Sequence, residues 1–350
     1  MPTKRVFATS VVHKNFLYII GGCDVSGVPL DAMEMYDGHK KWKRLMSMPT
    51  RRAGTAAVVV EDKIISMAGV AESQEPLDAV EIFDTNARTW SVVEPLGEAL
   101  LGISAVTRDN KILVVGGMGL DTNPRDTFVE FDVADNKWQK LPSMPTARYA
   151  AFTFIINNKL YVIGGRQGKL PTAAFEVYDF SEKKWTKLPD IPSKRVFAMY
   201  TASDTHIFSV GGLRQPATEG FSDACEVFDI AAGTWKLGAS MPTKRADFAV
   251  GILHDRLVCA GGLGNEGKPL AIVESYCPST DKWQQEKPMP STHCSCSYLV
   301  HNGCLYVGRD RGEPTPGVET ADECGPVEAN PALPDRLETN PTLPGKTPVF

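Results

Sequence analysis

Several features that would assign a protein to a broad class are missing from these 350 residues. No apolar run approaches the ~20 residues that a membrane-spanning helix needs. The net charge of −5 lacks the basic excess of a general nucleic-acid binder. We therefore expect a chain that binds neither a membrane nor nucleic acid.

Signals of secretion are also missing. The first residues, MPTKRVFATS, enter a repeat directly, so no signal peptide is expected. No Asn-x-Ser/Thr site occurs without an intervening proline, and the eight cysteines lack the spacing of a disulfide framework. These absences favour a reducing, cytoplasmic location.

What the chain has is a repeat of 47 to 50 residues, seen completely in Pro145–Arg195. The unit opens with Pro-Thr-x-Arg and contains two apolar runs, a double glycine, a Tyr or Phe and a tryptophan. The double glycine recurs as Ala68-Gly69 in one unit and is degraded to Gly308-Arg309 in the last. The tryptophans mark the register at Trp42, Trp90, Trp138, Trp185, Trp235 and Trp283. A period of this length with strand-length apolar runs is typical of a propeller.

Each unit reads as four short antiparallel strands. In the unit of Trp185 the expected strands are Ala150–Ile156, Lys159–Gly164, Phe175–Asp179 and Trp185–Leu188. A sheet with two apolar faces cannot stand alone, and seven of them around an axis bury one another's faces. The predicted fold is all-β, a seven-bladed propeller with four-stranded antiparallel blades and an incomplete last blade.

The pattern resembles the kelch repeat, in which a double glycine is followed by Tyr or Phe and, six or seven residues later, by Trp. The resemblance covers residues 1 to about 310. The segments Gly164–Pro171, Lys244–Gly251 and Gly261–Asn265 are similar to members that carry no appended catalytic or oligomerisation domain. The resemblance implies a propeller whose opening arginines contact acidic side chains of a bound peptide.

We expect one propeller domain over residues 1–323 and a proline-rich, disordered tail over residues 324–350. Blade seven has no tryptophan, and Val318-Glu319 is its expected third strand. The seam between blades seven and one should be the weakest place. The predicted blades are 5–46, 52–93, 100–141, 148–188, 195–237, 245–285 and 293–321.

The candidate binding residues are arginines. Five open a blade, at Arg5, Arg52, Arg148, Arg195 and Arg245, while Leu100 and His293 fill the two gaps. Arg166 and Arg214 follow double glycines and should share the same face, with Arg125 and Lys169 as further candidates. Guanidinium groups bind carboxylates through paired hydrogen bonds. The alternative is structural, because a glutamate also recurs in every blade and could pair with the opening arginine.

Other residues that invite chemistry have simpler explanations. The glutamates Glu34, Glu81, Glu130, Glu176, Glu226, Glu274 and Glu319 recur too regularly to be catalytic acids. Cys294-Ser295-Cys296 lacks a second ligand pair for a metal, so core packing is favoured. Gly117-Met118-Gly119 precedes no helix, which fails the context of a dinucleotide site. No catalytic residue, metal or cofactor is predicted.

The sequence supports three hypotheses about function. The leading hypothesis is a non-enzymatic interaction module or adaptor that binds an acidic protein loop or peptide on the arginine-bearing face. The kelch resemblance implies ubiquitin-ligase or cytoskeletal assemblies as settings. The second is a kelch-type enzyme, such as an epimerase, lyase or oxidase, acting through its loops. The third is a self-assembling architectural subunit, suggested by the open seam.

Overall fold

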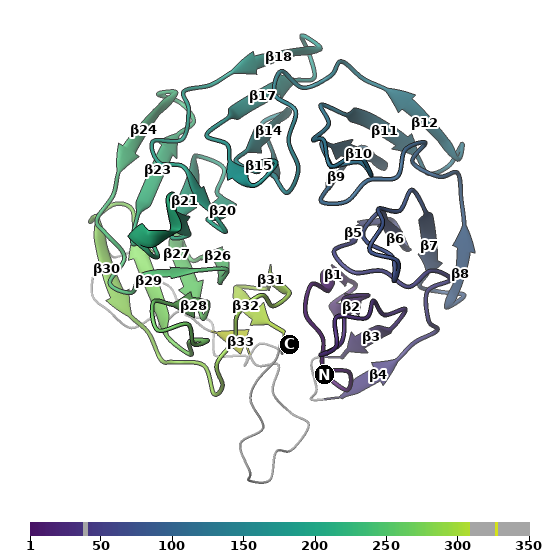
Figure 1. The fold of residues 1–350 in the computed structure, drawn as a ribbon, viewed down its shortest axis with the longest axis horizontal. Helices are drawn as coiled ribbons and strands as arrows, with labels where there is room; N and C mark the ends of the chain where they lie inside the picture. The colour runs from purple at the N-terminus through teal and green to yellow at the C-terminus, as the bar shows by residue number, and fades with distance from the viewer. Residues whose placement is uncertain (38–40, 309–325, 328–350) are drawn as a thin grey trace, which may run out of the picture.

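The computed structural model describes residues 1–37, 41–308 and 326–327, and the sheets of these residues form a ring (Figure 1). Six sheets have four strands and a seventh has three. The strands of the seven blades are β1 Thr9–His13, β2 Phe16–Ile20, β3 Met33–Tyr36, β4 Trp42–Arg44; β5 Ala56–Val60, β6 Lys63–Met67, β7 Val80–Asp84, β8 Thr89–Val92; β9 Ser104–Arg108, β10 Lys111–Val115, β11 Phe128–Asp132, β12 Lys137–Lys140; β13 Phe152–Ile156, β14 Lys159–Ile163, β17 Phe175–Asp179, β18 Lys184–Lys187; β20 Met199–Ala202, β21 His206–Val210, β23 Cys225–Asp229, β24 Thr234–Leu237; β26 Ala249–Leu253, β27 Arg256–Ala260, β29 Val273–Cys277, β30 Lys282–Gln285; and β31 Tyr298–His301, β32 Cys304–Val307, β33 Pro326–Val327.

Each blade is an antiparallel meander, with its first strand at the axis and its last at the rim. In blade four, Phe175–Asp179 matches the predicted third strand, and the other three strands differ by one or two residues at their ends. Trp185 lies opposite Tyr178 on the neighbouring strand, and their ring centroids are 5.2 Å apart. The aromatic–Trp spacing seen in the sequence is therefore a cross-strand pair.

Blade seven has three described strands, and the third of these is β33. Pro326 pairs with Tyr306 and Val327 with Leu305. The expectation that residues 324–350 are entirely tail is therefore wrong at these two positions. Val318, Glu319 and the remainder of the tail lie outside the described residues. Pro326 lacks a backbone N–H, so β33 has one hydrogen-bond donor fewer than a regular strand.

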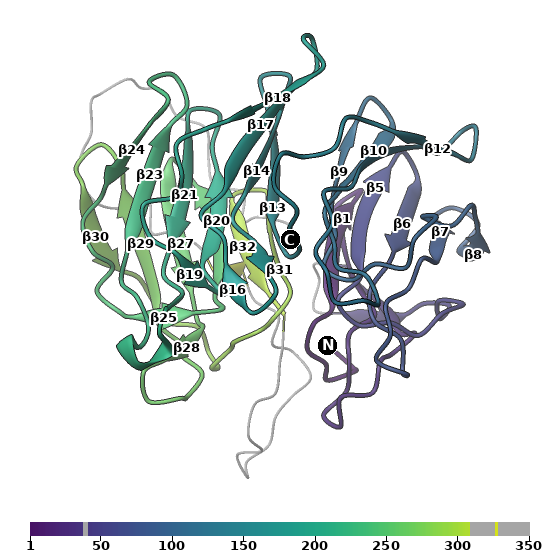
Figure 2. The same cartoon turned by 45° about the horizontal axis from the view of Figure 1, so that its top comes forward.

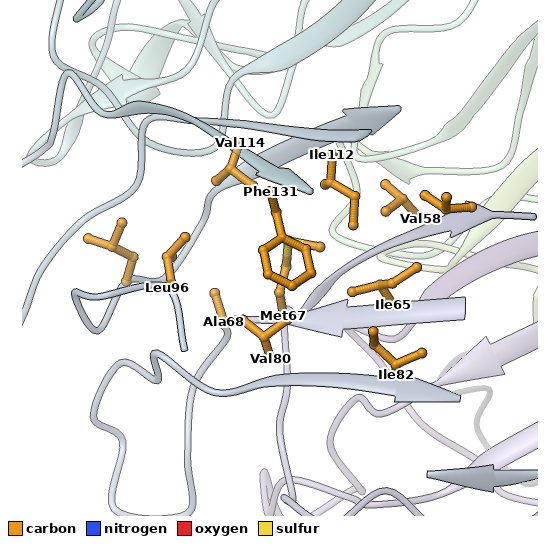
Figure 3. Close-up of a cluster of buried hydrophobic side chains, with 12 residues drawn as sticks. Val58, Ile65, Met67, Ala68, Val80, Ile82, Leu96, Ile112, Val114 and Phe131 are labelled. Carbon is orange, nitrogen blue, oxygen red and sulfur yellow. The ribbon is translucent and has the colours of Figure 1, made fainter. Parts of the chain in front are cut away.

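The hydrophobic core lies between the blades. Blades two and three share one such layer, in which Ile65 and Val80 face Ile112 and Phe131, all 0% exposed (Figure 3). Comparable layers occupy the interfaces between the other blades. Each blade is thus shielded from water by its two neighbours, and the stability of the ring depends on their remaining in contact.

The double glycines join successive blades. Gly21 has a φ of +61°, and an added Cβ would lie 2.6 Å from the carbonyl oxygen of Arg52, which opens the next blade. The neighbouring Gly22 N–H donates to that same oxygen at 3.0 Å. Blade two has Ala68 at this position with a φ of +57°, in the left-handed region that an alanine side chain disfavours.

Three short ladders lie on one face of the ring (Figure 2). They pair β15 Arg166–Gln167 with β16 Leu170–Pro171, β19 Arg195–Val196 with β22 Leu213–Arg214, and β25 Arg245–Ala246 with β28 Leu263–Gly264. We call this the loop face; it carries the loops between the second and third strands and the connections between blades. The axial channel behind it has a volume of about 460 Å³ and is lined by the innermost strands.

Helix contributes little to the described residues. The single turn η1, Ala217–Glu219, lies in the long loop of blade five. None of the described helical residues forms a segment long and apolar enough to cross a membrane.

Exchanging glycine and alanine should test the blade connection. We expect Ala68→Gly to raise the free energy of unfolding by about 1 kcal/mol, because it removes a disfavoured backbone conformation. Gly21→Ala should lower the free energy of unfolding by more than about 1 kcal/mol, because the disfavoured backbone conformation and a clash of the new Cβ with a backbone oxygen both cost free energy. Urea denaturation measures both, and a stabilising Gly21→Ala would contradict this description of the junction.

Candidate functional site

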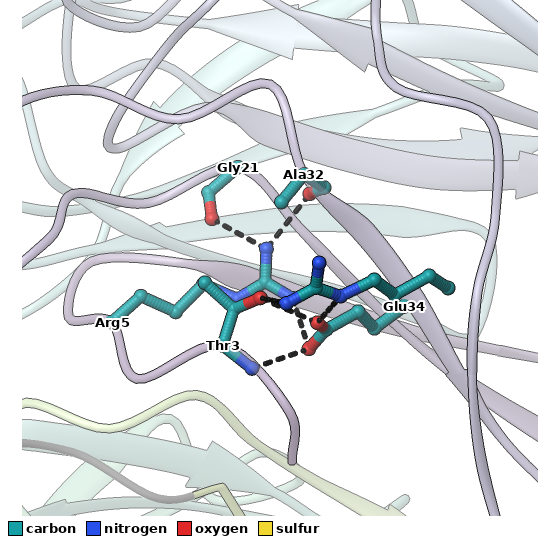
Figure 4. A network of polar contacts seen from close by, with 6 residues as sticks. Thr3, Arg5, Gly21, Ala32 and Glu34 are labelled. Carbon is teal, nitrogen blue, oxygen red and sulfur yellow. Dashed lines mark hydrogen bonds and ion pairs between the residues drawn. The ribbon is translucent and has the colours of Figure 1, made fainter.

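The five opening arginines are buried rather than presented to solvent. Their exposed fractions are 3% for Arg5, 0% for Arg52, Arg148 and Arg245, and 4% for Arg195. Each guanidinium forms an ion pair with the recurring glutamate of its own blade, as in Arg5 Nη2 to Glu34 Oε2 at 2.8 Å (Figure 4). The other pairs are Arg52–Glu81, Arg148–Glu176, Arg195–Glu226 and Arg245–Glu274.

These arginines also bind the backbone of the blade. Arg5 Nη1 donates to the carbonyl oxygens of Gly21 at 3.1 Å and Ala32 at 2.8 Å, so it closes the loop between the second and third strands. Thr3 Oγ1 donates to the second oxygen of Glu34 at 2.6 Å. The Pro-Thr-x-Arg motif therefore places two donors on one glutamate.

The prediction that Arg5, Arg52, Arg148, Arg195 and Arg245 bind a partner is wrong, since a partner on the loop face cannot reach them. The structural alternative is confirmed. Burial lowers the pKa of the Arg148 guanidinium, and attraction to Glu176 opposes that change. In blade three, where Leu100 replaces the arginine, Glu130 instead pairs with Lys111 Nζ at 2.8 Å.

Arg166 and Arg214 do lie on the loop face. The Arg166 guanidinium is 5.9 Å from the ring centroid of Tyr149 and 5.6 Å from that of Phe197. It donates to the Lys169 carbonyl at 3.1 Å, but its buried Nε–H has no acceptor and it forms no ion pair among the described residues. Arg214 is 42% exposed and contacts Asp223 at 3.2 Å.

Arg125, a further candidate, differs from Arg166 because its guanidinium forms ion pairs with carboxylates of this chain. Its guanidinium contacts Glu98 at 2.8 Å and Asp121 at 3.0 Å, and its exposed fraction is 24%. The hydrogen bonds that Arg125 donates to Asp121 and Glu98 raise the pKa of its guanidinium. Two carboxylates already satisfy this cation, so it is a weaker candidate for binding an external acid.

Charge divides the loop face into two halves. Exposed cations of the loops and connections of blades four to six are Lys169, Lys194, Lys244 and Lys268, beside Arg166 and Arg214 and interrupted by Asp190, Glu219 and Glu266. We call this the basic half. The corresponding segments of blades two and three expose mainly acids, namely Glu72, Glu75, Asp78, Glu98, Asp121 and Asp126.

Sequence reasoning missed an aromatic feature of the same face. Two residues after each opening position the backbone has positive φ, and five blades place Gly54, Gly102, Ala150, Asp247 or Ser295 there. The other two have Phe7 and Phe197, which are 57% and 54% exposed. Comparing this register between blades could have revealed them, because phenylalanine disfavours that conformation. The Gly54 N–H donates to the Phe7 carbonyl at 2.9 Å, so the feature links neighbouring blades.

One cavity lies away from the loop face, between blades five and six. It has a volume of about 1,090 Å³ and is lined by residues that include His206, His254, Arg256, Cys277 and Lys282. Within the described part of the chain, no three His, Cys, Asp or Glu side chains are grouped to hold a metal ion. Cys296, from the motif weighed as a metal ligand, packs against the core of blades six and seven.

Cys277 occupies a position that is aspartate in five blades. Asp84, for example, accepts hydrogen bonds from the N–H groups of Asn86 and Ala87, which fixes the turn before the fourth strand. Burial alone would raise the pKa of the Cys277 thiol, but hydrogen bonds from Ser279 and Thr280 outweigh it and lower the pKa to about 7. The thiolate thus takes the place of the carboxylate. The hydrogen bonds that lower its pKa come from its own turn.

The lowered pKa of the Cys277 thiol should make it react with alkylating reagents near neutral pH. We expect iodoacetamide to label Cys277 with a rate that rises through a midpoint near pH 7. Cys259 is the internal control, because burial raises the pKa of its thiol to about 12. Peptide mass spectrometry measures both rates. A Cys277 midpoint near that of an ordinary thiol would contradict the assignment.

Substituting a buried, paired arginine should reduce stability more than substituting an arginine of the loop face. Arg148→Ala leaves the Glu176 carboxylate buried and unpaired, and we expect it to lower the free energy of unfolding by about 3–5 kcal/mol. Arg166→Ala should cost less than about 1 kcal/mol, because only partly exposed ring contacts are lost. Denaturant titration compares the variants, and equal losses would refute the distinction.

Comparison with known proteins agrees with this architecture. The sequence model of the KLHDC2/KLHL20/DRC7 Kelch-repeats domain matches residues 102–308, and that of the Attractin/LZTR1 beta-propeller matches residues 1–198. The solved structure of YjhT superposes with a TM-score of 0.67 at 16% identity, covering 82% of this chain and 99% of that one. At this identity the likeness concerns the fold alone.

Curated relatives support the resemblance expected from the sequence. The chain is 42% identical over 151 residues to Kelch domain-containing protein 8B of Rattus norvegicus, which is 41% of this chain and 43% of that protein. It is 33% identical over 81 residues to Beta-scruin of Limulus polyphemus, covering 23% and 9% of the two chains. It is 33% identical over 85 residues to F-box/kelch-repeat protein At1g16250 of Arabidopsis thaliana, covering 24% and 22%. The aligned segment thus spans less than half of the first relative.

Because the Kelch-repeats model covers more than half of the chain, this protein belongs to the kelch-repeat family of β-propellers.

Proposed function

We propose that this propeller is a non-enzymatic protein-interaction module that binds an acidic loop or peptide on the basic half of the loop face. The observation that carries the proposal is Arg166, whose guanidinium is held between Tyr149 and Phe197 without a carboxylate partner in the described residues. Because ring contacts already restrain this guanidinium, it loses little further conformational freedom when a partner binds. It also offers paired hydrogen-bond donors to a carboxylate.

The surroundings of Arg166 support an acidic partner. Lys169 and Lys194 are exposed nearby in the loop and connection that flank it, and Arg214 contributes from blade five. Exposed Phe197 and Leu170 add apolar area at the same place. Arginine and aromatic side chains together are typical of the residues that dominate the energy of protein interfaces.

The cellular setting belongs to the same proposal. The kelch resemblance implies ubiquitin-ligase or cytoskeletal assemblies as settings, and the name of one relative includes an F-box. We propose a cytoplasmic protein of this general kind, whose propeller presents one partner to another.

Charge reversal tests the face. Arg166→Glu with Arg214→Glu should abolish capture of the partner proteins that the original chain retains, because two attractions become repulsions. Lys140→Glu with Lys187→Glu makes the same change in net charge on the outer strands and should leave capture intact. Quantitative affinity capture compares the three proteins, with thermal denaturation to confirm folding. Equal loss with both pairs would argue for net charge rather than this face, and unchanged capture would refute the site.

A further inference from the structure

Tryptophan side chains connect neighbouring blades at the rim by a repeated hydrogen bond. The indole N–H of Trp90 donates to the Met46 carbonyl of the preceding blade at 2.9 Å, and Trp138 donates to Glu94 at 3.0 Å. In every case the acceptor lies four residues after the tryptophan of the preceding blade. The same bond is made by Trp185 to Pro142, Trp235 to Pro189 and Trp283 to Ala239.

Trp42 departs from this rule. Its Nε1 is buried but has no hydrogen-bond partner among the described residues. The register of the other five places its acceptor just after the fourth strand of blade seven. The outermost strand described in that blade is the third, β33. A buried donor without an acceptor is unfavourable, so this position calls for a backbone carbonyl.

The inner strands of blades one and seven are in contact with each other. Ser10 Oγ donates to the Tyr298 carbonyl at 3.0 Å, which joins β1 to β31. Leu17 and Tyr36 of blade one share a core cluster with Cys304 and Tyr306 of blade seven. Blades one and seven thus lie beside each other in the ring (Figure 1). Among the described residues, blade seven is the sheet whose outermost strand is a third strand rather than a fourth.

We infer that blade seven accepts an extended segment of a partner protein as its fourth strand, paired with β33 and presenting a carbonyl to Trp42. Adding a strand to a free sheet edge satisfies the backbone groups of both chains. The six fourth strands of this chain define the segment that fits. Each contains a tryptophan, lacks proline and, apart from the half-buried Gln284, exposes its other side chains.

The sequence after β33 does not match that description. Residues 328–350 contain no tryptophan and include Pro331, Pro334, Pro341, Pro344 and Pro348. Proline lacks the N–H that a sheet ladder requires. A strand supplied by another protein, with an aromatic residue at its start, is therefore the occupant that fits the register.

The test uses the full chain and a synthetic peptide of residues 181–190, SEKKWTKLPD, which contains a fourth strand of this protein and its acceptor. Labelling tryptophan with ¹⁵N gives six indole signals, one for each tryptophan. Without peptide we expect the Trp42 N–H to exchange with solvent faster than the other five. Added peptide should shift and slow this signal, and it should slow amide exchange in the segment that contains β33, the strand it pairs with, in hydrogen-exchange mass spectrometry.

Two controls make the result specific. A peptide with Trp185→Ala should bind more weakly, because the aromatic contact is lost. The protein variant Trp42→Phe should bind the original peptide roughly five- to tenfold more weakly, since one hydrogen bond is lost and the ring remains.

Three outcomes would overturn the inference. One is no binding of the peptide, and another is binding that leaves the Trp42 signal unchanged. The third is slow Trp42 exchange without peptide, together with protected amides within residues 328–350, which would assign the position to this chain's own sequence. None of these outcomes bears on the charge-reversal test of the loop face.

Discussion

The buried pair of an arginine and a glutamate holds each regular blade in shape. In blade one the guanidinium binds the carboxylate of Glu34 and two carbonyl oxygens of the following loop. Taking two charges out of water is costly, and the cost is offset only when every donor nearby is well placed. The geometry of the loop is therefore constrained at its base, while the residues at its tip remain free to differ between blades.

This constraint separates structure from function on the loop face. The arginines that repeat are internal, and the arginines that do not repeat, Arg166 and Arg214, lie in the short ladders of the loop face. Blade three shows that the pair is replaceable. With Leu100 in place of the arginine, the glutamate turns to Lys111 and the blade keeps its four strands.

The ring could be predicted from the sequence because its features repeat. A tryptophan, an aromatic and a double glycine in constant register define strands and junctions without knowledge of contacts. The role of the opening arginines could not be chosen in the same way. Their acceptors include carbonyl oxygens, which every residue has, so the sequence does not show that a guanidinium such as that of Arg5 is already occupied.

Departures from the repeat were harder to recognise than the repeat itself. Phe197 and Cys277 became informative only when the structure showed what their positions require, a left-handed backbone and a hydrogen-bond acceptor. Strand β33 was not expected because Pro326 is a poor strand former, and pairing with Tyr306 overrides that preference.

The opposite charges of the two halves of the loop face have a consequence before any contact forms. A surface with cations on one side and anions on the other generates a field with a direction in the plane of the ring. A dipolar molecule approaching it experiences a torque as well as an attraction. It would arrive already rotated toward its bound orientation, and dissolved ions would weaken that guidance by screening the field.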